Sequence, residues 1–125
     1  MQQSLKEFQR EVTTLYKVRH PNLVLFVGAC ADKGHIMILT EFCSGGSLFS
    51  LLHEKRSINL SLKQKHRMAL DIAKGMNYLH TQEPPILHRD LKSLNLLVYE
   101  QVRSNSDFIQ IKITDFGLSR HNDDL

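Results

Sequence analysis

Four polar residues in the second half of the chain have the types and spacing that phosphoryl transfer requires. Lys92 and Asn95 follow Asp90 by two and five residues, and Asp115 follows Asn95 by twenty. The carboxylate of Asp90 can orient a hydroxyl nucleophile and accept its proton, while Lys92 offsets charge on the transferring group. An amide oxygen from Asn95 and a carboxylate from Asp115 are hard ligands that suit Mg²⁺. The pattern predicts Asp90 and Lys92 as catalytic residues.

The neighbours of the two acidic residues narrow the interpretation. Asp90 ends His88-Arg89-Asp90, and Asp115 begins Asp115-Phe116-Gly117. Taken alone, Asp90 reads as an ordinary loop carboxylate and Asp115 as a turn residue before a glycine. Their common occurrence in this order is typical of phosphoryl transfer from ATP to a hydroxyl. The combination therefore favours the catalytic interpretation.

On these motifs the chain resembles the protein kinase family. The segments 26–30 (Phe-Val-Gly-Ala-Cys) and 88–93, together with a long segment at 99–107, are similar to the tyrosine-kinase-like group near the mixed-lineage kinases. The resemblance implies an α+β fold class, as a partial two-lobed protein kinase fold, with ATP and Mg²⁺ as cofactors. It implies a protein substrate with Ser or Thr, favoured by Lys92, with dual specificity left open. The fold does not identify a particular substrate.

Apolar spacing and turn residues predict the elements of this fold. Residues 5–16 have helical periodicity, with a capping box from Ser4 and Glu7 at the start. Strands are expected through 28–30 and over 35–39, joined by a turn at 32–34. The turn 45–47 should begin a short helix. Ser61 and Gln64 predict a second capping box on a longer helix. The expected buried positions are Leu5, Phe8, Val12, Leu15 and Tyr16 in the first helix, and Leu62, Ala69, Ile72, Ala73, Met76 and Leu79 in the long one.

By resemblance these elements are the C-helix, strands four and five, the hinge, the D-helix and the E-helix. The catalytic loop, strands six to eight and the start of the activation loop follow. The whole of 1–125 would be a partial kinase domain: 1–40 a remnant of the N-lobe, 41–44 the hinge and 45–125 the first part of the C-lobe.

The resemblance also implies roles for individual residues. Thr40, Glu41, Cys43 and Leu97 would lie around the adenine, and Asn95 and Asp115 would hold the metal. Leu15, Phe26, His88 and Phe116 would stack as the regulatory spine, Arg89 would receive an activation-loop phosphate, and Gly117 completes its motif. Glu11 would be the C-helix glutamate. For Glu11, a solvated helix charge that pairs with a neighbour four residues away is an equal alternative.

The glycine-rich loop and the Val-Ala-Ile-Lys strand of the family have no counterpart in the chain. We therefore expect a partial record of a serine/threonine kinase, inactive as an isolated chain, with exposed apolar surface and marginal stability. Two alternatives stay open. The chain is a non-catalytic kinase-like interaction protein, or it is a nonfunctional remnant that folds poorly.

Composition adds exclusions. A net charge of +3 does not call for nucleic acid, and no apolar stretch is long enough to cross a membrane. Without a signal peptide, a cytoplasmic location is the default expectation. Two cysteines in unlike contexts predict reduced thiols, Cys30 in the core and Cys43 inert at the hinge. The seven histidines lack metal-ligand spacing, so no structural metal is expected.

Overall fold

The computed structural model describes residues 2–55, 57–88, 90–116 and 120–121. Its secondary structure is mixed, which confirms the predicted α+β class. The elements in chain order are α1 (Gln2–Lys17), β1 (Phe26–Asp32), β2 (His35–Thr40), α2 (Leu48–His53), α3 (Leu62–His80), β3 (Ile86–Leu87), the 3₁₀ turn η1 (Ser93–Asn95), β4 (Leu96–Val98), β5 (Ile111–Ile113) and β6 (Arg120–His121). The strands form three antiparallel pairs, β1–β2, β3–β6 and β4–β5.

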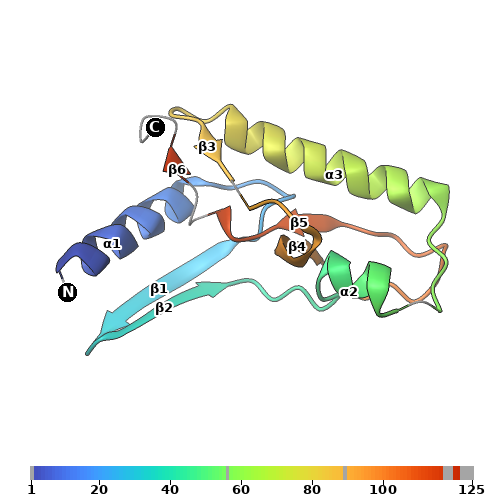
Figure 1. The fold of residues 1–125 in the computed structure, drawn as a ribbon, viewed down its shortest axis with the longest axis horizontal. Helices are drawn as coiled ribbons and strands as arrows, with labels where there is room; N and C mark the ends of the chain where they lie inside the picture. The colour runs from blue at the N-terminus through green and yellow to red at the C-terminus, as the bar shows by residue number, and fades with distance from the viewer. Residues whose placement is uncertain (1, 56, 89, 117–119, 122–125) are drawn as a thin grey trace.

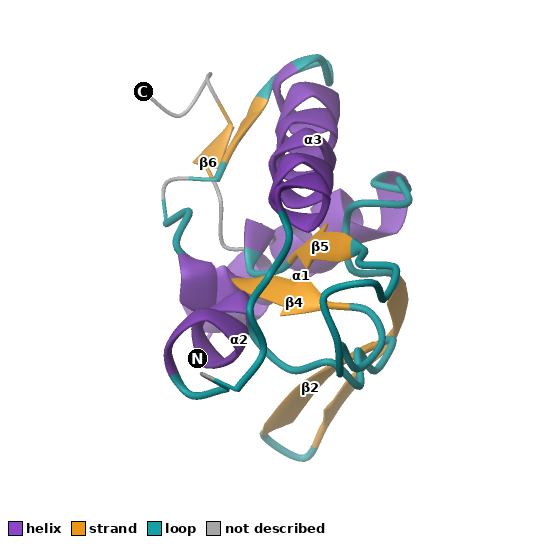
Figure 2. Ribbon diagram, turned by 90° about the vertical axis from the view of Figure 1, so that its right-hand side faces the viewer, coloured by secondary structure: helices purple, strands orange, loops and turns teal. Residues whose placement is uncertain are grey.

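The core lies between α3 and the short β4–β5 pair. Figures 1 and 2 show α3 lying across β5, with α2 on the other side of β4, while β1 and β2 extend away as a long ribbon. Ile111, Ile113 and Val98 have no solvent-exposed surface. The segment after α1 joins this core, because the N–H of Ile113 donates to the main-chain oxygen of Asn22 (2.8 Å). This packing fixes the strands around which the candidate site is built.

The β1–β2 ribbon is closed by the predicted turn. Lys33 and Gly34 have φ values of 47° and 80°, as expected for a two-residue hairpin turn that matches strand twist. Most side chains on both strands are exposed. The prediction that Cys30 is a core residue is wrong, because Cys30 is exposed on this two-stranded ribbon.

Helix α1 differs from its prediction at both ends. It begins at Gln2, so Ser4 falls inside the helix and the predicted Ser4–Glu7 capping box is wrong. Of the predicted apolar stripe, Leu15 is buried, whereas Leu5 and Tyr16 are 44% and 67% exposed. The reason is that the last turn of the helix and the residue after it contribute Leu15 and Val18 to the core, while the beginning of the helix projects away from the core (Figure 1).

The capping box at the start of α3 is confirmed. The Ser61 hydroxyl accepts the Gln64 N–H (3.1 Å), and the Gln64 side-chain oxygen accepts the Ser61 N–H (2.9 Å). The predicted buried face is only partly right. Leu79 is buried, but Leu62 is 71% exposed and Ala69 and Ala73 are also exposed.

A buried carboxylate and a glycine explain why the buried face of α3 differs from the predicted one. Asp71 is buried and accepts the N–H of Ile111 (2.9 Å), which ties the helix to β5. Gly75 brings the two backbones close, since a Cβ there would lie 2.7 Å from Ile113 Cδ1 and 3.0 Å from the Asn22 oxygen. An apolar pattern alone does not reveal that Asp71 and Gly75 face the core. In the part of the chain that the structure describes, no helix is long and apolar enough to cross a membrane.

The predicted turn before the short helix is confirmed. Ser47 caps α2 by accepting the N–H of Ser50 (3.1 Å), and Gly46 has a φ of 73°. Gly45 N–H donates to the Val98 oxygen (3.0 Å), and Val98 N–H donates to the Gly46 oxygen (2.8 Å). These bonds hold the segment that follows residue 43 beside β4.

Candidate active site

The structure brings Asp90, Lys92 and Asn95 together on one loop. The side-chain Nδ2 of Asn95 donates to the main-chain oxygen of Asp90 (2.9 Å) and to its Oδ2 (3.3 Å). Lys92 Nζ lies 3.5 Å from the same Oδ2. Asn95 is buried, whereas the Asp90 and Lys92 side chains are 65% and 52% exposed. The carboxylate of Asp90 is thus held by the buried Asn95 and remains accessible to a second molecule.

His88 and Thr114 connect this loop to the segment that contains Asp115. Asp90 N–H donates to Nδ1 of His88 (3.2 Å), so the ring proton lies on Nε2, which donates to the Thr114 oxygen (2.7 Å). Thr114 N–H donates in turn to the main-chain oxygen of Asn95 (3.0 Å). His88 is buried, and its two ring nitrogens link the loop of Asp90 to the segment of Asp115.

Asp115 lies at a cavity of about 270 Å³ that is lined by four separate parts of the chain. Its lining residues are Glu11, Leu15, Val24, Ile38, Thr40, Thr114, Asp115 and Phe116. The predicted residues Glu11, Thr40 and Asp115 therefore share one space, although α1, β2 and the segment after β5 supply them. Asp115 has a φ of 62°, an uncommon value for a residue other than glycine that typically marks functional or turn positions.

The cavity contains an electrostatic conflict between two carboxyl groups. Burial, and then the negative charge of Asp115, raise the pKa of Glu11. A cation between or beside these groups would reduce the conflict. Among the residues the structure describes, no group of three or more His, Cys, Asp or Glu could hold a metal ion.

A smaller donor set of Asn95 and Asp115 fits Mg²⁺ chemically. Because Asn95 gives its Nδ2 to Asp90, its Oδ1 is the atom that can face a cation. An amide oxygen and a carboxylate are hard ligands, and Mg²⁺ commonly keeps waters and phosphate oxygens as its other ligands. The hydrogen bond from Thr114 to Asn95 places the two residues on adjoining segments.

Glu41 has a structural role that the sequence did not reveal. Its side chain accepts the N–H of Leu25 (2.9 Å) and forms an ion pair with Lys112, a buried lysine within β5. Lys112 also lies over the ring of Tyr99, at 4.7 Å from the centroid. The only feature of the sequence that could have indicated this ion pair is the position of Lys112 between two isoleucines. These contacts attach the predicted hinge, residues 41–44, to the β4–β5 core.

The other residues predicted around the adenine lie close to that attachment. Cys43 is buried, and burial followed by the charge of Glu41 raises the pKa of its thiol, while Lys112 acts in the opposite direction. A raised pKa keeps the thiol protonated, in agreement with the inert interpretation. Leu97 is half-buried in β4, opposite Lys112. Contact between these residues and a nucleotide stays a prediction.

Three of the four predicted spine residues are buried. Leu15, His88 and Phe116 are 7%, 4% and 3% exposed, and Phe26 is partly buried against the same core. Their stacking as a functional unit stays a prediction. Arg89 and Gly117 lie outside the described residues, so the predicted phosphate contact of Arg89 also stays a prediction.

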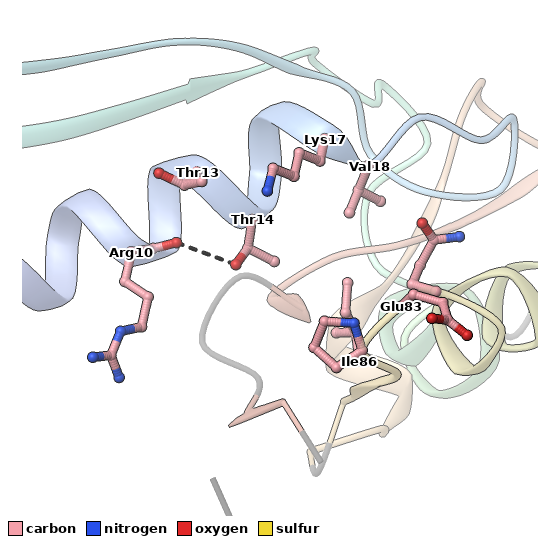
Figure 3. A pocket seen from close by; sticks show the side chains of 9 residues that line it. Arg10, Thr13, Thr14, Lys17, Val18, Glu83 and Ile86 are labelled. Atoms are coloured by element: carbon pink, nitrogen blue, oxygen red, sulfur yellow. Dashed lines mark hydrogen bonds between the residues drawn. The ribbon is translucent and has the colours of Figure 1, made fainter. Parts of the chain in front are cut away.

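A second cavity, of about 280 Å³, lies between α1 and the segment before β3 (Figure 3). Arg10, Thr14 and Lys17 line it from the helix, and Glu83 and Ile86 from the other side. The hydroxyl of Thr14 donates to the main-chain oxygen of Arg10 (3.1 Å), one turn earlier. This cavity includes none of the predicted catalytic, nucleotide-binding or metal-binding residues, so the candidate site is the loop and cavity around Asp90 and Asp115.

Comparison with known proteins agrees with this geometry. A family model described as protein tyrosine and serine/threonine kinase matches residues 1–124. The chain belongs to the protein kinase family. The match includes the Asp90 loop, Asp115 and the predicted hinge in one continuous stretch.

Relatives of this kinase segment come from distant organisms. The chain is 49% identical over 118 residues to the serine/threonine-protein kinase CTR1 of Arabidopsis thaliana, covering 93% of the chain and 13% of that protein. It is 49% identical over 114 residues to the serine/threonine-protein kinase TNNI3K of Mus musculus, covering 90% and 13%. A dual specificity protein kinase, splA of Dictyostelium discoideum, is 49% identical over 132 residues, covering 94% and 5%. The chain thus spans about a tenth of the length of these relatives.

Proposed function

We propose that this chain supplies the catalytic loop, the metal-binding residues and the hinge of a serine/threonine protein kinase. Such a kinase transfers the terminal phosphoryl group of ATP to a hydroxyl of a protein substrate. The observation that carries the proposal is the Asp90, Lys92 and Asn95 cluster, which is hydrogen-bonded to the segment of Asp115. The names of the relatives support serine or threonine as the acceptor of the phosphoryl group, and one relative is named a dual specificity protein kinase.

Asp90 is the proposed base. Its side chain is 65% exposed, so a substrate hydroxyl can approach, while the amide of Asn95 limits the rotation of the carboxylate. The carboxylate would accept the hydrogen bond of that hydroxyl and then its proton. Lys92, 3.5 Å from the carboxylate, would lie beside the phosphoryl group and offset its charge.

Asn95 and Asp115 are the proposed ligands of Mg²⁺. The bound ion would neutralise phosphate charge during transfer. The chain holds these ligands through the hydrogen bonds that Asn95 makes to Asp90 and accepts from Thr114. Removal of either bond would loosen a ligand without removing it.

The nucleotide is proposed to lie between residues 1–40 and 45–125, against the hinge 41–44. Support comes from the cavity that Thr40 and Asp115 share and from the attachment of Glu41 to β5 through Lys112. Cys43 and Leu97 would contact the adenine from the C-lobe side. A cytoplasmic location belongs to the same proposal, supported by two cysteines that form no disulfide.

The decisive experiment replaces the proposed base in the full-length protein that contains this segment. With Asp90→Asn, turnover should fall by about 10²–10⁴-fold, because a base acts mainly in the transition state. ATP affinity should hardly change. The matched control is Asp32→Asn, which changes an exposed carboxylate in the β1–β2 ribbon. If the Asp90→Asn protein keeps normal phosphate transfer to a protein substrate, Asp90 is not the base.

A further inference from the structure

A groove of about 700 Å³ lies at the end of the molecule where α3 begins. The first two turns of α3 form one wall, and residues 105–109 form the other. Figures 1 and 2 both show the beginning of α3 beside the long connection between β4 and β5. Neither wall includes a residue of the proposed phosphoryl-transfer site.

The walls of the groove are held in place by hydrogen bonds. Gln64 donates through Nε2 to the main-chain oxygens of Ser104 and Asp107, both at 3.0 Å. The carboxylate of Asp107 accepts the N–H groups of Arg103 (2.8 Å) and Ser104 (3.1 Å) and the hydroxyl of Ser104 (2.9 Å). The turn is thereby fixed against the helix, so the groove exists before any partner binds.

Apolar side chains are exposed within the groove. Leu70 is 48% exposed and Phe108 is 68% exposed, while Ile109 is buried behind them. The guanidinium of Arg67 lies over the Phe108 ring, 5.0 Å from its centroid. A rigid aromatic ring beside an aliphatic side chain is a common anchor point for an apolar side chain of a partner.

Basic side chains gather around these residues, and of these Arg67 forms an ion pair with Asp71. Lys63, His66 and Arg67 line the groove, and the first turn of α3 contains no acidic residue. Basic groups near a helix start oppose the helix dipole, which favours acidic groups there. Among the described lining residues the one carboxylate is that of Asp107, and it is already occupied by its own turn. Departures from such local preferences, here the preference of a helix start for acidic side chains, are expected at functional sites.

We propose that this groove binds an acidic, apolar peptide segment of a partner protein. An apolar side chain of the segment lies between Leu70 and Phe108, and flanking Asp or Glu residues face Lys63 and Arg67. The ion pair of Arg67 with Asp71 uses Nε (3.2 Å), and the terminal amino groups of the guanidinium supply further donors. The groove is a docking surface and does not depend on phosphoryl transfer at Asp90.

The first test leaves the chain unchanged and varies the probe. A labelled ten-residue peptide with two leucines flanked by glutamates is titrated with the 125-residue chain by fluorescence anisotropy. Replacing the glutamates by glutamines, or the leucines by serines, should each weaken binding by about tenfold. Equal binding of the serine peptide, or of a labelled oligonucleotide, would overturn the proposal, because it would mean unspecific attraction of polyanions.

The second test varies the groove and uses matched controls on the same helix. Phe108→Ser should weaken binding of the leucine–glutamate peptide by about tenfold, and Lys63→Glu by about fivefold. Leu62→Ser and Lys65→Glu change exposed α3 residues that do not line the groove, and should have little effect. Thermal unfolding checks that each variant is folded. If Phe108→Ser does not fold, the proposal is tested by the varied peptides on the unmodified chain alone. Binding to this chain but not to the longer protein would instead assign the groove to the protein's own continuation.

Discussion

Glu11 and Asp115 place two carboxyl groups at one cavity. Both carboxyl groups line the same space, and the pKa of Glu11 is raised by burial and by the charge of Asp115. Lys92 lies on the neighbouring loop, 3.5 Å from Asp90. The interpretation of Glu11 as a purely solvated helix charge is therefore weaker, because the residue faces the candidate site.

The first prediction concerns the stability cost of Glu11. Its folded-state pKa is raised above the ordinary value of 4.5, so the native state binds the proton more tightly than the unfolded state. Stability is then lost as pH rises from about that value through the raised pKa. Glu11→Gln should raise the melting temperature slightly at pH 7, with the difference disappearing below the ordinary pKa.

Glu7→Gln is the matched control for this experiment, since Glu7 is exposed on the same helix. Its melting temperature at pH 7 should stay close to that of the unmodified chain. Thermal unfolding followed by circular dichroism between pH 4 and pH 8 makes the measurement. A lower melting temperature of Glu11→Gln at pH 7 would mean that Glu11 has a stabilising cationic partner.

At the scale of elements, α3 shows what the sequence could and could not predict. Its capping box follows from Ser61 and Gln64, because both hydrogen bonds are local. Its buried face does not follow, because Asp71 and Gly75 are placed there by β5 and by the segment of Asn22, which are distant in sequence. The ion pair between Glu41 and Lys112 could not be predicted for the same reason, because the two residues are distant in sequence. The catalytic loop was predicted because its residues lie within a few positions of one another.

The second prediction tests the close approach of α3 to β5. Gly75→Ala would place a Cβ 2.7 Å from Ile113 Cδ1 and 3.0 Å from the Asn22 oxygen. The backbone oxygen cannot move as easily as a side chain. The free energy of unfolding of the variant should therefore fall by about 1–3 kcal/mol. This loss would be measured by chemical denaturation and would exceed the gain of about 1 kcal/mol in helix propensity.

Gly28→Ala provides the comparison for Gly75→Ala. No atom lies within 4 Å of a Cβ built at Gly28, so this change should be neutral or slightly stabilising. A Gly75→Ala chain as stable as the Gly28→Ala chain would contradict the proposed tight contact between helix and strand.

For the molecule as a whole, large apolar side chains are exposed both on the predicted N-lobe elements and on the rest of the chain. Val27, Met37 and Leu39 are 65%, 55% and 52% exposed on the β1–β2 ribbon, and Tyr16 is 67% exposed on α1. Exposed apolar surface was expected, and it also includes Phe42, Leu62 and Phe108, which are 87%, 71% and 68% exposed. The predicted N-lobe elements are joined to the rest through several contacts, among them the hydrogen bonds between Asn22 and β5 and the ion pair of Glu41. A nucleotide bound beside the hinge would add contacts between the two parts.

The last prediction concerns the connection between these two parts of the chain. Mg·ATP that binds Thr40 and Asp115 from opposite sides of the hinge should raise the melting temperature of the 125-residue chain, with a rise that grows with the logarithm of the nucleotide concentration once it exceeds the dissociation constant. Asp115→Asn should remove most of the rise, because it weakens a proposed metal ligand, while Asp32→Asn should keep it. Differential scanning calorimetry with Mg·ATP, with ATP plus a chelator and without nucleotide separates metal-dependent binding from other effects. A cooperative transition that ignores Mg·ATP in the unmodified chain would favour a non-catalytic interaction role for this chain, since the candidate site would then form without binding its nucleotide.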